Sequence, residues 1–196
     1  KHPDAIQFDR VLFNFPSIQF VSDDPRDAME PLERFYRDLP RFADKIVICS
    51  GGDRYDFGEA HFDILCSADS ALNVNTCNNS CLVFRLELGK KTALFLADCG
   101  EEEGDKLLSM WDLGKLSADI CQMAHHGQAG VKRNLYEVVR PETCIWCAPD
   151  WLWNNDAGKG YDTHTFKTIL TRGWMDQLGA TRHVVLKDGT QTVLMD

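Results

Sequence analysis

Short apolar runs alternate with amphipathic segments along most of the chain. The runs are rich in Val, Ile, Leu and Phe and end at Gly, Pro, Asn or Asp, a pattern typical of β-strands. A strand is predicted within 11–20, where Pro16 ends it, and a short buried strand is predicted at 45–50. Further strands are predicted at 60–67, 81–88, 91–98, 119–124 and 143–148.

Glycine-containing dipeptides mark two tight turns. Gly89-Lys90 separates two apolar runs and predicts a β-hairpin over 81–98, and Asp188-Gly189 predicts another over 183–195. Two other segments contain many turn-forming residues, including Gly, Asp, Asn and Ser, and are predicted to be loops. They are 51–59 and 68–80.

Apolar residues at helical spacing separate several of these strands. They predict helices at about 26–43, 101–114, 131–139 and 161–174. Strands alternate with helices in the second half of the chain, which indicates an α/β fold in which a mixed sheet is covered by helices. A chain of 196 residues is expected to form a single domain, 1–196.

Composition excludes some classes of protein. The formal net charge of −9 disfavours a nucleic-acid partner, because phosphates would meet a surface of like charge. No apolar run approaches the roughly 20 residues of a membrane-spanning helix, and no signal-peptide pattern is present. Eight cysteines lie mostly in apolar runs, which indicates reduced thiols and a cytoplasmic protein. Cys144 and Cys147 form a lone Cys-x-x-Cys pair, for which packing along a strand is favoured over zinc or redox chemistry.

Metal-binding residue types stand at the predicted ends of two strands. One apolar run ends at Asp98, and one predicted helix later another ends at His125 and His126, before Gly127. Parallel strands bring their C-terminal ends to the same edge of a sheet, where ligands collect. A carboxylate and an imidazole together suit zinc or manganese. The alternative is that Asp98 only caps the helix that follows it.

The other histidines are less informative. His164 lies at the start of the last predicted helix, where it either points back at the same strand edge or is an exposed polar residue. His61 and His183 fall within predicted strands and are expected to be ordinary sheet residues.

The order of these features resembles the metallo-β-lactamase-fold hydrolases, above all the hydrolase-like C-terminal domain of the DNA-uptake competence protein. The resemblance rests on NNSCLVFRLELGKKTALFLAD, ADICQMAHHG and GYDTHTF, within about 75–195. It implies an αββα sandwich and a site with two metal ions, zinc or manganese.

The same resemblance assigns roles to individual residues. It implies that Asp98 bridges the two metals and that His125, or alternatively His126, binds one of them. It implies that His164 stabilises charge on the substrate or the leaving group. Asn79 and Ser80 match the Asn-Ser step of the family and would lie near the site.

One family motif is absent. His-x-His-x-Asp-His supplies most of the metal ligands in the family, and it does not occur in these 196 residues. The resemblance therefore implies the C-terminal part of a larger hydrolase, a partial sandwich that exposes apolar surface or dimerises, and little or no metal bound by this chain alone. In the intact enzyme, water activated by the metals would attack a phosphodiester or ester-type bond, and small-molecule substrates are expected. The alternative is a degenerate, non-catalytic α/β binding or interaction domain.

Overall fold

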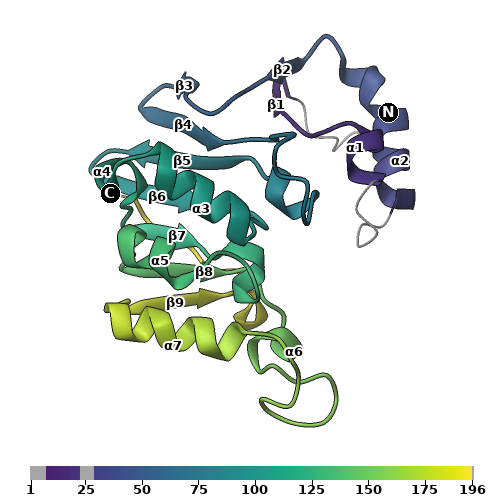
Figure 1. The fold of residues 1–196 in the computed structure, drawn as a ribbon. Coiled ribbons are helices and arrows are strands. Elements are labelled where there is room, and N and C mark those ends of the chain that lie inside the picture. Colours follow the sequence, from purple (N-terminus) through teal and green to yellow (C-terminus); the bar gives the residue numbers. More distant parts are fainter. Residues whose placement is uncertain (1–7, 23–28, 196) are drawn as a thin grey trace.

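The computed structural model describes residues 8–22 and 29–195, and one mixed sheet of seven strands runs through it (Figure 1). The strands lie side by side in chain order, from β3 at one edge to β9 at the other. They are β3 (Arg54–Phe57), β4 (Ala60–Cys66), β5 (Val83–Leu88), β6 (Lys91–Phe95), β7 (Ile120–Gln122), β8 (Thr143–Trp146) and β9 (Arg182–Val185).

Strand direction changes in the middle of this sheet. β3 to β6 are antiparallel, and tight turns with left-handed Gly58 and Gly89 join β3 to β4 and β5 to β6. β6 to β9 are parallel, because helical segments carry the chain back between them. The C-terminal ends of β6 to β9 therefore meet at one edge of the sheet.

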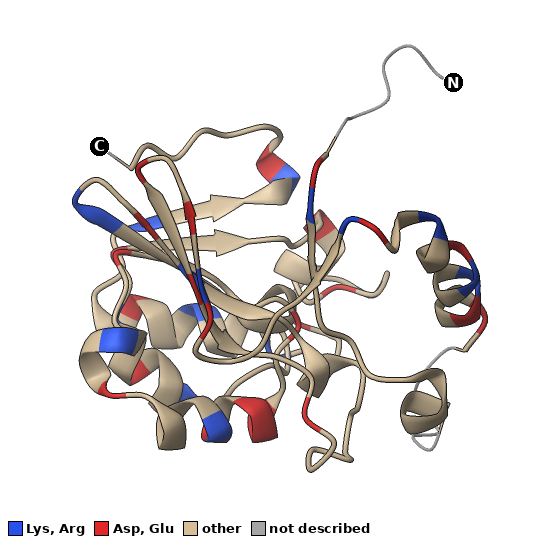
Figure 2. Ribbon diagram, turned by 90° about the horizontal axis from the view of Figure 1, so that it is seen from above, with Lys and Arg blue, Asp and Glu red and all other residues tan. Residues whose placement is uncertain are grey.

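Helices cover one face of the sheet, as Figures 1 and 2 show from two directions. The helices on this face are α3 (Glu101–Met110), α4 (Leu113–Leu116), α5 (Arg133–Val139) and α7 (Thr168–Leu178). The core lies between these two layers, where Leu94 and Trp146 from the strands meet Leu107 and Leu135 from the helices, all fully buried. Burial of apolar surface between the layers is the main source of stability.

The opposite face of the sheet carries a ladder of four phenylalanines. Phe57, Phe62, Phe84 and Phe95 come from β3, β4, β5 and β6, and successive ring centroids are 5.5, 5.7 and 4.7 Å apart. The C-terminal segment after β9 crosses the sheet on this side (Figures 1 and 2). An extended chain thus lies over the face that the helices leave open.

The N-terminal elements form a small separate layer. β1 (Val11–Phe13) and β2 (Ile46–Ile48) pair in parallel as a two-stranded sheet, beside α1 (Ile18–Ser22) and α2 (Met29–Asp38). The side-chain nitrogen Nδ2 of Asn14 donates to the carbonyl oxygen of Cys49 at 2.7 Å and to Ser67 Oγ at 3.2 Å. The second bond connects this layer to the end of β4.

The structure confirms the α/β class, the mixed sheet and the helical cover. The predicted hairpin over 81–98 is β5 and β6, and the predicted strands at 60–67, 119–124 and 143–148 contain β4, β7 and β8. Of the αββα sandwich that the resemblance implied, the described residues form one large sheet with helices on one face. The two-stranded sheet of β1 and β2 lies beside it. No helix in the described residues is long and apolar enough to cross a membrane.

Several predicted boundaries were wrong. Segment 51–59, predicted as a loop, contains β3, because pairing with β4 outweighs the turn-forming residues around it. The helix predicted at 161–174 begins only at Thr168, and a short helix, α6 (Asp150–Trp153), precedes it. The predicted C-terminal hairpin is β9 followed by a 3₁₀ turn, Leu186–Asp188, with no second strand within the described residues.

Three further predictions need correction at the level of single segments. Only 11–13 of the strand predicted within 11–20 is extended, and 18–22 is helical. The strand at 45–50 is not fully buried, because Ile48 is 63% exposed in a sheet of only two strands. None of the eight cysteines, all of which lie in the described residues, forms a disulfide, and Cys144 is buried on β8, whereas Cys147 lies beyond the strand and is exposed.

Candidate functional site

Asp98 and His126 face each other just beyond the ends of β6 and β7. Asp98 Oδ1 lies 3.5 Å from His126 Nε2, and each side chain is 41% exposed. The two chain segments stay together past the strand ends, because Gln122 Oε1 accepts hydrogen bonds from the backbone nitrogens of Leu96 and Ala97. The predicted meeting of a carboxylate and an imidazole at this edge is present in the structure.

The backbone around the pair is strained. Ala97, His125 and His126 have positive φ values of 47°, 47° and 59°, in the left-handed region that side chains with a Cβ rarely adopt. Such residues persist only where surrounding structure holds them, and they concentrate at functional sites. Here the backbone nitrogen of His125 donates to the carbonyl oxygen of Ala97 at 2.9 Å, which joins the two strained segments.

Gly127 allows the chain to turn sharply after the histidines. Its φ is +84°, and a Cβ at this position would lie 2.3 Å from the ring of Trp146. Trp146 is itself held from behind, since its Nε1 donates to His183 Nδ1 at 3.0 Å. His183 Nε2 lies 3.1 Å from Asp176 Oδ1 and completes this support. His183 therefore has a structural role on β9, in agreement with the sequence-based expectation.

A backbone carbonyl orients the ring of His126. Its Nδ1 lies 3.0 Å from the carbonyl oxygen of Cys147, and because a carbonyl can only accept, Nδ1 must carry the proton. In the neutral ring, Nε2 then presents a lone pair towards the negatively charged Asp98. That arrangement is favourable only with a proton or a metal cation between the two atoms. The same carbonyl–imidazole contact orients many metal-binding histidines.

His125 is placed differently from its neighbour. Its Nδ1 is buried and has no hydrogen-bond partner among the described residues, and its ring centroid lies 6.0 Å from that of His126. The sequence left open which histidine would join Asp98. In the structure, the imidazole in contact with the Asp98 carboxylate is that of His126.

Asn79 and Ser80 lie in a short 3₁₀ turn, η2 (Asn78–Ser80), beside the start of α3. Asn79 Nδ2 donates to Glu102 Oε2 at 2.8 Å, and Asn79 Oδ1 accepts from the backbone nitrogen of Glu103 at 3.4 Å. Asn79 therefore binds the first turn of α3. Asp98 does not cap this helix, whose N-cap residue is Gly100.

Cys81 connects this turn to the candidate site. The backbone nitrogen of Asp98 donates to Cys81 Sγ at 3.2 Å. Burial, together with the negative charge of Glu103, raises the pKa of Cys81 to about 12, so its thiol stays protonated at neutral pH. Asn79 and Ser80 thus stand two residues and one residue before a side chain that contacts the Asp98 backbone.

Glu103 is a functional candidate that the sequence reasoning missed. It falls in the helix predicted at 101–114 and received no role there, but its side chain is fully buried, and burial raises its pKa to about 7. The thiols of Cys66 and Cys99 face it, yet neither carboxylate oxygen has a partner in good hydrogen-bonding geometry within the described chain. Its position three residues from Gly100, on the inner side of the first helical turn, was the available signal.

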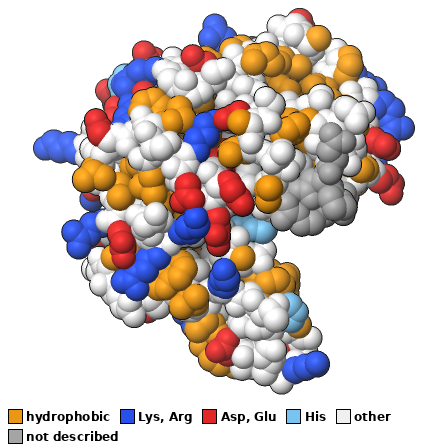
Figure 3. Space-filling view, viewed as in Figure 1, with side chains coloured by type: hydrophobic (Ala, Val, Ile, Leu, Met, Phe, Trp, Pro, Cys, Tyr) orange, Lys and Arg blue, Asp and Glu red, His pale blue; other side chains and the backbone are white. Residues whose placement is uncertain are grey.

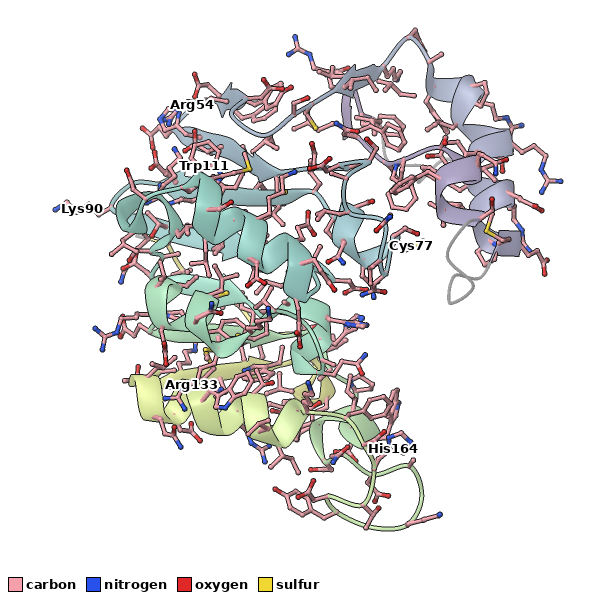
Figure 4. All side chains as sticks on the ribbon, in the orientation of Figure 1. Arg54, Cys77, Lys90, Trp111, Arg133 and His164 are labelled. Carbon is pink, nitrogen blue, oxygen red and sulfur yellow. The ribbon has the colours of Figure 1, made fainter. Side chains whose placement is uncertain are left out.

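His164 lies away from the pair, in the loop between α6 and α7 (Figure 4). Its ring stacks on Phe166 with centroids 4.2 Å apart, and the Nδ2 of buried Asn155 donates to its backbone oxygen at 2.8 Å. Neither a hydrogen bond nor an ion pair joins it to Asp98 or His126 in the described structure. Its catalytic role stays a prediction.

One side of the molecule is hollowed. Figure 3 shows a recess on the right of the molecule, between the N-terminal elements above and the loop after α6 below, with a histidine side chain at its inner edge. Asp98 and His126 are each 41% exposed and are therefore accessible to a small molecule.

The side chains at this edge match the ligands of a metal ion only in part. Asp98 and His126 are a suitable carboxylate and imidazole, but no group of three or more His, Cys, Asp or Glu side chains in the described part of the chain is arranged to hold a metal ion. A catalytic zinc takes about three protein ligands. The described residues therefore offer two candidate ligands at this edge and do not form a complete metal centre.

Comparisons with known proteins add only fold-level likeness. No protein-family model and no curated protein matches the chain. One similar solved structure is the metallo-β-lactamase fold protein YhfI from Bacillus subtilis, at 11% identity and a TM-score of 0.45, over 78% of this chain and 59% of that one. Another is a mutant of the β-hydroxylase CmlA, at 14% identity and a TM-score of 0.48, over 90% of this chain and 38% of that one. The chain thus spans well under two thirds of either protein, and likeness at this level assigns no residue a role.

Proposed function

We propose that this chain is the C-terminal part of a metal-dependent hydrolase and that Asp98 and His126 supply two ligands of its metal centre. One observation carries the proposal. A carboxylate oxygen lies 3.5 Å from Nε2 of an imidazole whose Nδ1 is committed to a backbone carbonyl, an arrangement that is favourable with a proton or, as proposed here, a metal cation between the two atoms. Zinc is the expected metal, with manganese as the alternative.

The remaining ligands are proposed to come from outside the described residues. The described part of the chain supplies a carboxylate and one imidazole, and the resemblance to the competence-protein branch supports the proposal that a histidine motif upstream provides the other ligands. The half-exposed pair is open to a substrate. Strain at Ala97, His125 and His126 supports a site held in advance of binding.

Hydrolysis of a phosphodiester or ester-type bond in a small molecule is the proposed reaction. A nucleic-acid polymer is disfavoured by the net charge of −9 and by the acidic start of α3, which follows Asp98 closely. A small substrate makes few long-range charge contacts and is less affected by this field.

The second candidate is a non-catalytic α/β binding or interaction domain. The observation that favours it is the missing third ligand among the described residues. In that case the pairing of Asp98 and His126 is a remnant, and substitution of either residue changes neither metal content nor activity.

The proposal is tested by elemental analysis of this chain and of the longest natural form of the protein. We expect close to two zinc or manganese ions per long chain, and little in the 196 residues alone. Asp98→Asn and His126→Gln in the long form should reduce bound metal and abolish hydrolysis of a generic phosphodiester or ester.

A matched control is available on the β3–β4 hairpin. Asp56 and His61 form a second carboxylate–imidazole pair, at 2.5 Å, and Asp56→Asn or His61→Gln should leave metal content and activity unchanged. Absence of metal from the long form, or equal effects of the two pairs of substitutions, would favour the non-catalytic domain.

A further inference from the structure

The segment between β8 and α7 carries a group of aromatic side chains at the edge of the sheet where the candidate site lies. This segment, 147–167, contains the short helix α6. The Phe166 ring contacts two others, because its centroid lies 4.2 Å from that of His164, in a stacked arrangement, and 5.6 Å from that of Trp151. These three residues, Trp151, His164 and Phe166, are called the aromatic group below.

The first residue of the segment contacts the Asp98–His126 pair itself. The carbonyl oxygen of Cys147 lies 3.0 Å from His126 Nδ1. Trp151 follows four residues later, so its Cα is at most about 14 Å from that of Cys147. Trp151 therefore stands at the same edge of the sheet as the pair, within a short distance of it.

The last residue of the segment contacts the helix that follows Asp98. Lys167 Nζ lies 3.9 Å from Glu101 Oε1, in the first turn of α3. Phe166 directly precedes Lys167 and is held beside this turn. The loop after α6 forms the lower side of the recess in Figure 3, and Figure 4 labels His164 on that loop. The aromatic group therefore belongs to the lower side of the recess.

One buried side chain holds the loop that carries two of the three rings. Asn155 is 2% exposed, and its Nδ2 donates to Asp162 Oδ1 at 2.7 Å and to the carbonyl oxygen of His164 at 2.8 Å. Its Oδ1 accepts from the backbone nitrogen of Phe166 at 3.1 Å. Residues ordered in this way before binding lose less conformational entropy when a ligand arrives.

Trp151 is 50% exposed, although tryptophan is usually well buried. Trp153, two residues later on α6, shows the contrast. Its ring packs edge-on against buried Trp146 with centroids 5.4 Å apart, and the guanidinium of Arg172 lies 4.3 Å from its centroid. The fold thus uses one tryptophan of α6 for packing and leaves the other half open to solvent. A continuous exposed aromatic surface on a rigid support is typical of a binding site.

We propose that this surface binds a planar aromatic ring, which stacks on Trp151, and that in the proposed hydrolase the ring is part of the substrate. The second statement rests on the proposed function, and the first does not. Together they narrow the substrate to a phosphodiester or ester that carries an aryl or heteroaryl ring near the bond that is broken. Aromatic side chains take such rings by stacking, which needs no hydrogen bond.

Two phosphodiesters of equal charge test ring binding on the 196-residue chain. Diphenyl phosphate has flat rings, whereas dicyclohexyl phosphate has saturated rings with more apolar surface. We expect diphenyl phosphate to shift the NMR signal of the Trp151 indole N–H and to bind at least about fivefold more tightly, the lower end of the effect of one stacked ring. General apolar contact would instead favour dicyclohexyl phosphate.

Two variants locate the binding, and ligand-detected NMR follows both. Trp151→Leu removes the aromatic ring, keeps an apolar side chain, and should weaken binding of diphenyl phosphate at least about fivefold. Phe57→Leu is the matched control, because Phe57 is 49% exposed and lies on β3, outside the aromatic group. It should leave the affinity unchanged.

Three results would overturn ring binding at this surface. These are equal affinity for the two phosphodiesters, wild-type affinity in Trp151→Leu, or the same loss in Phe57→Leu as in Trp151→Leu. Circular dichroism checks that each variant is folded. If Trp151→Leu does not fold, the wild-type titration decides, because an unshifted Trp151 indole signal at saturation excludes stacking on this residue.

Metal content and hydrolysis in the longest natural form test the proposed function separately. Diphenyl phosphate should inhibit that hydrolysis competitively, with an inhibition constant at least about fivefold higher in Trp151→Leu. Metal and hydrolysis without ring selectivity would refute the present proposal alone. Ring selectivity without metal or hydrolysis would support ring binding and refute the statement that the ring belongs to a substrate.

Discussion

Two carboxylate–imidazole pairs on this molecule have the same chemistry and different settings. Asp56 and His61 lie directly opposite each other on β3 and β4, in regular strand conformation, and their side chains hydrogen-bond at 2.5 Å. Asp98 and His126 lie beyond the ends of parallel strands, on strained backbone, at 3.5 Å. In the first pair each side chain is the hydrogen-bond partner of the other, whereas the longer distance in the second pair leaves room for a proton or a metal ion. Residue types alone therefore do not identify a site, and the backbone that presents them does.

The largest effect on the free energy of unfolding is expected at Gly127, which directly follows His126 of the second pair. In Gly127→Ala, the new Cβ would lie 2.3 Å from the Trp146 ring at a φ of +84°, so we expect a loss of about 2–5 kcal/mol in the free energy of unfolding. Gly58→Ala, in the turn next to the first pair, places its Cβ in open space at a φ of +62° and should cost only about 1–2 kcal/mol. Urea denaturation measures both, and equal losses would contradict the role given to Trp146.

A third carboxyl, that of Glu103, is expected to make the free energy of unfolding depend on pH. Glu103 is buried, and its pKa is raised from 4.5 to about 7 in the folded state. The unfolded chain releases this proton first, so the contribution of Glu103 to stability is highest below about pH 4.5 and falls by about 3 kcal/mol as the pH rises to about 7. Glu103→Gln should remove this fall.

Unfolding free energies of the wild type and Glu103→Gln at pH 5 and pH 8 measure the effect. Glu59→Gln, which changes an exposed carboxyl in the β3–β4 turn, serves as the control and should keep the fall. A pH dependence shared by wild type and Glu103→Gln would show that Glu103 titrates normally and is therefore reached by water.

Cys81 lies near Glu103 and contacts the backbone of Asp98, and we expect its substitution to have a smaller effect on the free energy of unfolding. Cys81→Ala leaves the backbone N–H of Asp98 without its acceptor and should cost about 1–2 kcal/mol. Cys81→Ser retains an acceptor atom at nearly the same position and should recover part of that loss. If serine and alanine are equally destabilising, the sulfur contributes by packing alone.

The smallest effect is expected at the first pair. The hydrogen bond from His61 holds the pKa of the exposed Asp56 carboxyl below its ordinary value of 3.8. His61→Gln removes the imidazole and should raise that pKa towards the ordinary value, as NMR titration of the Asp56 side chain would show. An unchanged titration would mean that the contact does not persist in solution.

Much of the fold could be predicted from local pattern. The hairpin of β5 and β6 follows from two β-rich runs around Gly89, and the helical α3 and α5 follow from periodicity and from the acidic start at Glu101. β3 was missed because turn-forming residues flank it on both sides, and the pairing partner that makes it a strand lies later in the chain. The late start of α7 was missed because the loop before it is ordered by buried Asn155, which no local pattern reveals.

In the candidate site, too, local pattern identified some residues and missed others. Asp98, His125 and His126 were identified because each stands where an apolar run ends, and strand ends are visible in the sequence. The choice of His126 over His125 rests on two left-handed residues and on the Cys147 carbonyl, which a linear pattern cannot place. Glu103 was missed because the rotation of α3 on the sheet, and not the helix itself, decides that its side chain is buried.

The sequence by itself determined the types and order of most elements and the residues at the strand ends, because hydrophobic period and turn chemistry act over a few neighbouring positions. Only the tertiary structure decided which imidazole meets Asp98 and which acid is buried among thiols. Those outcomes depend on contacts between segments far apart in the chain, where packing and burial override the local preference of each residue.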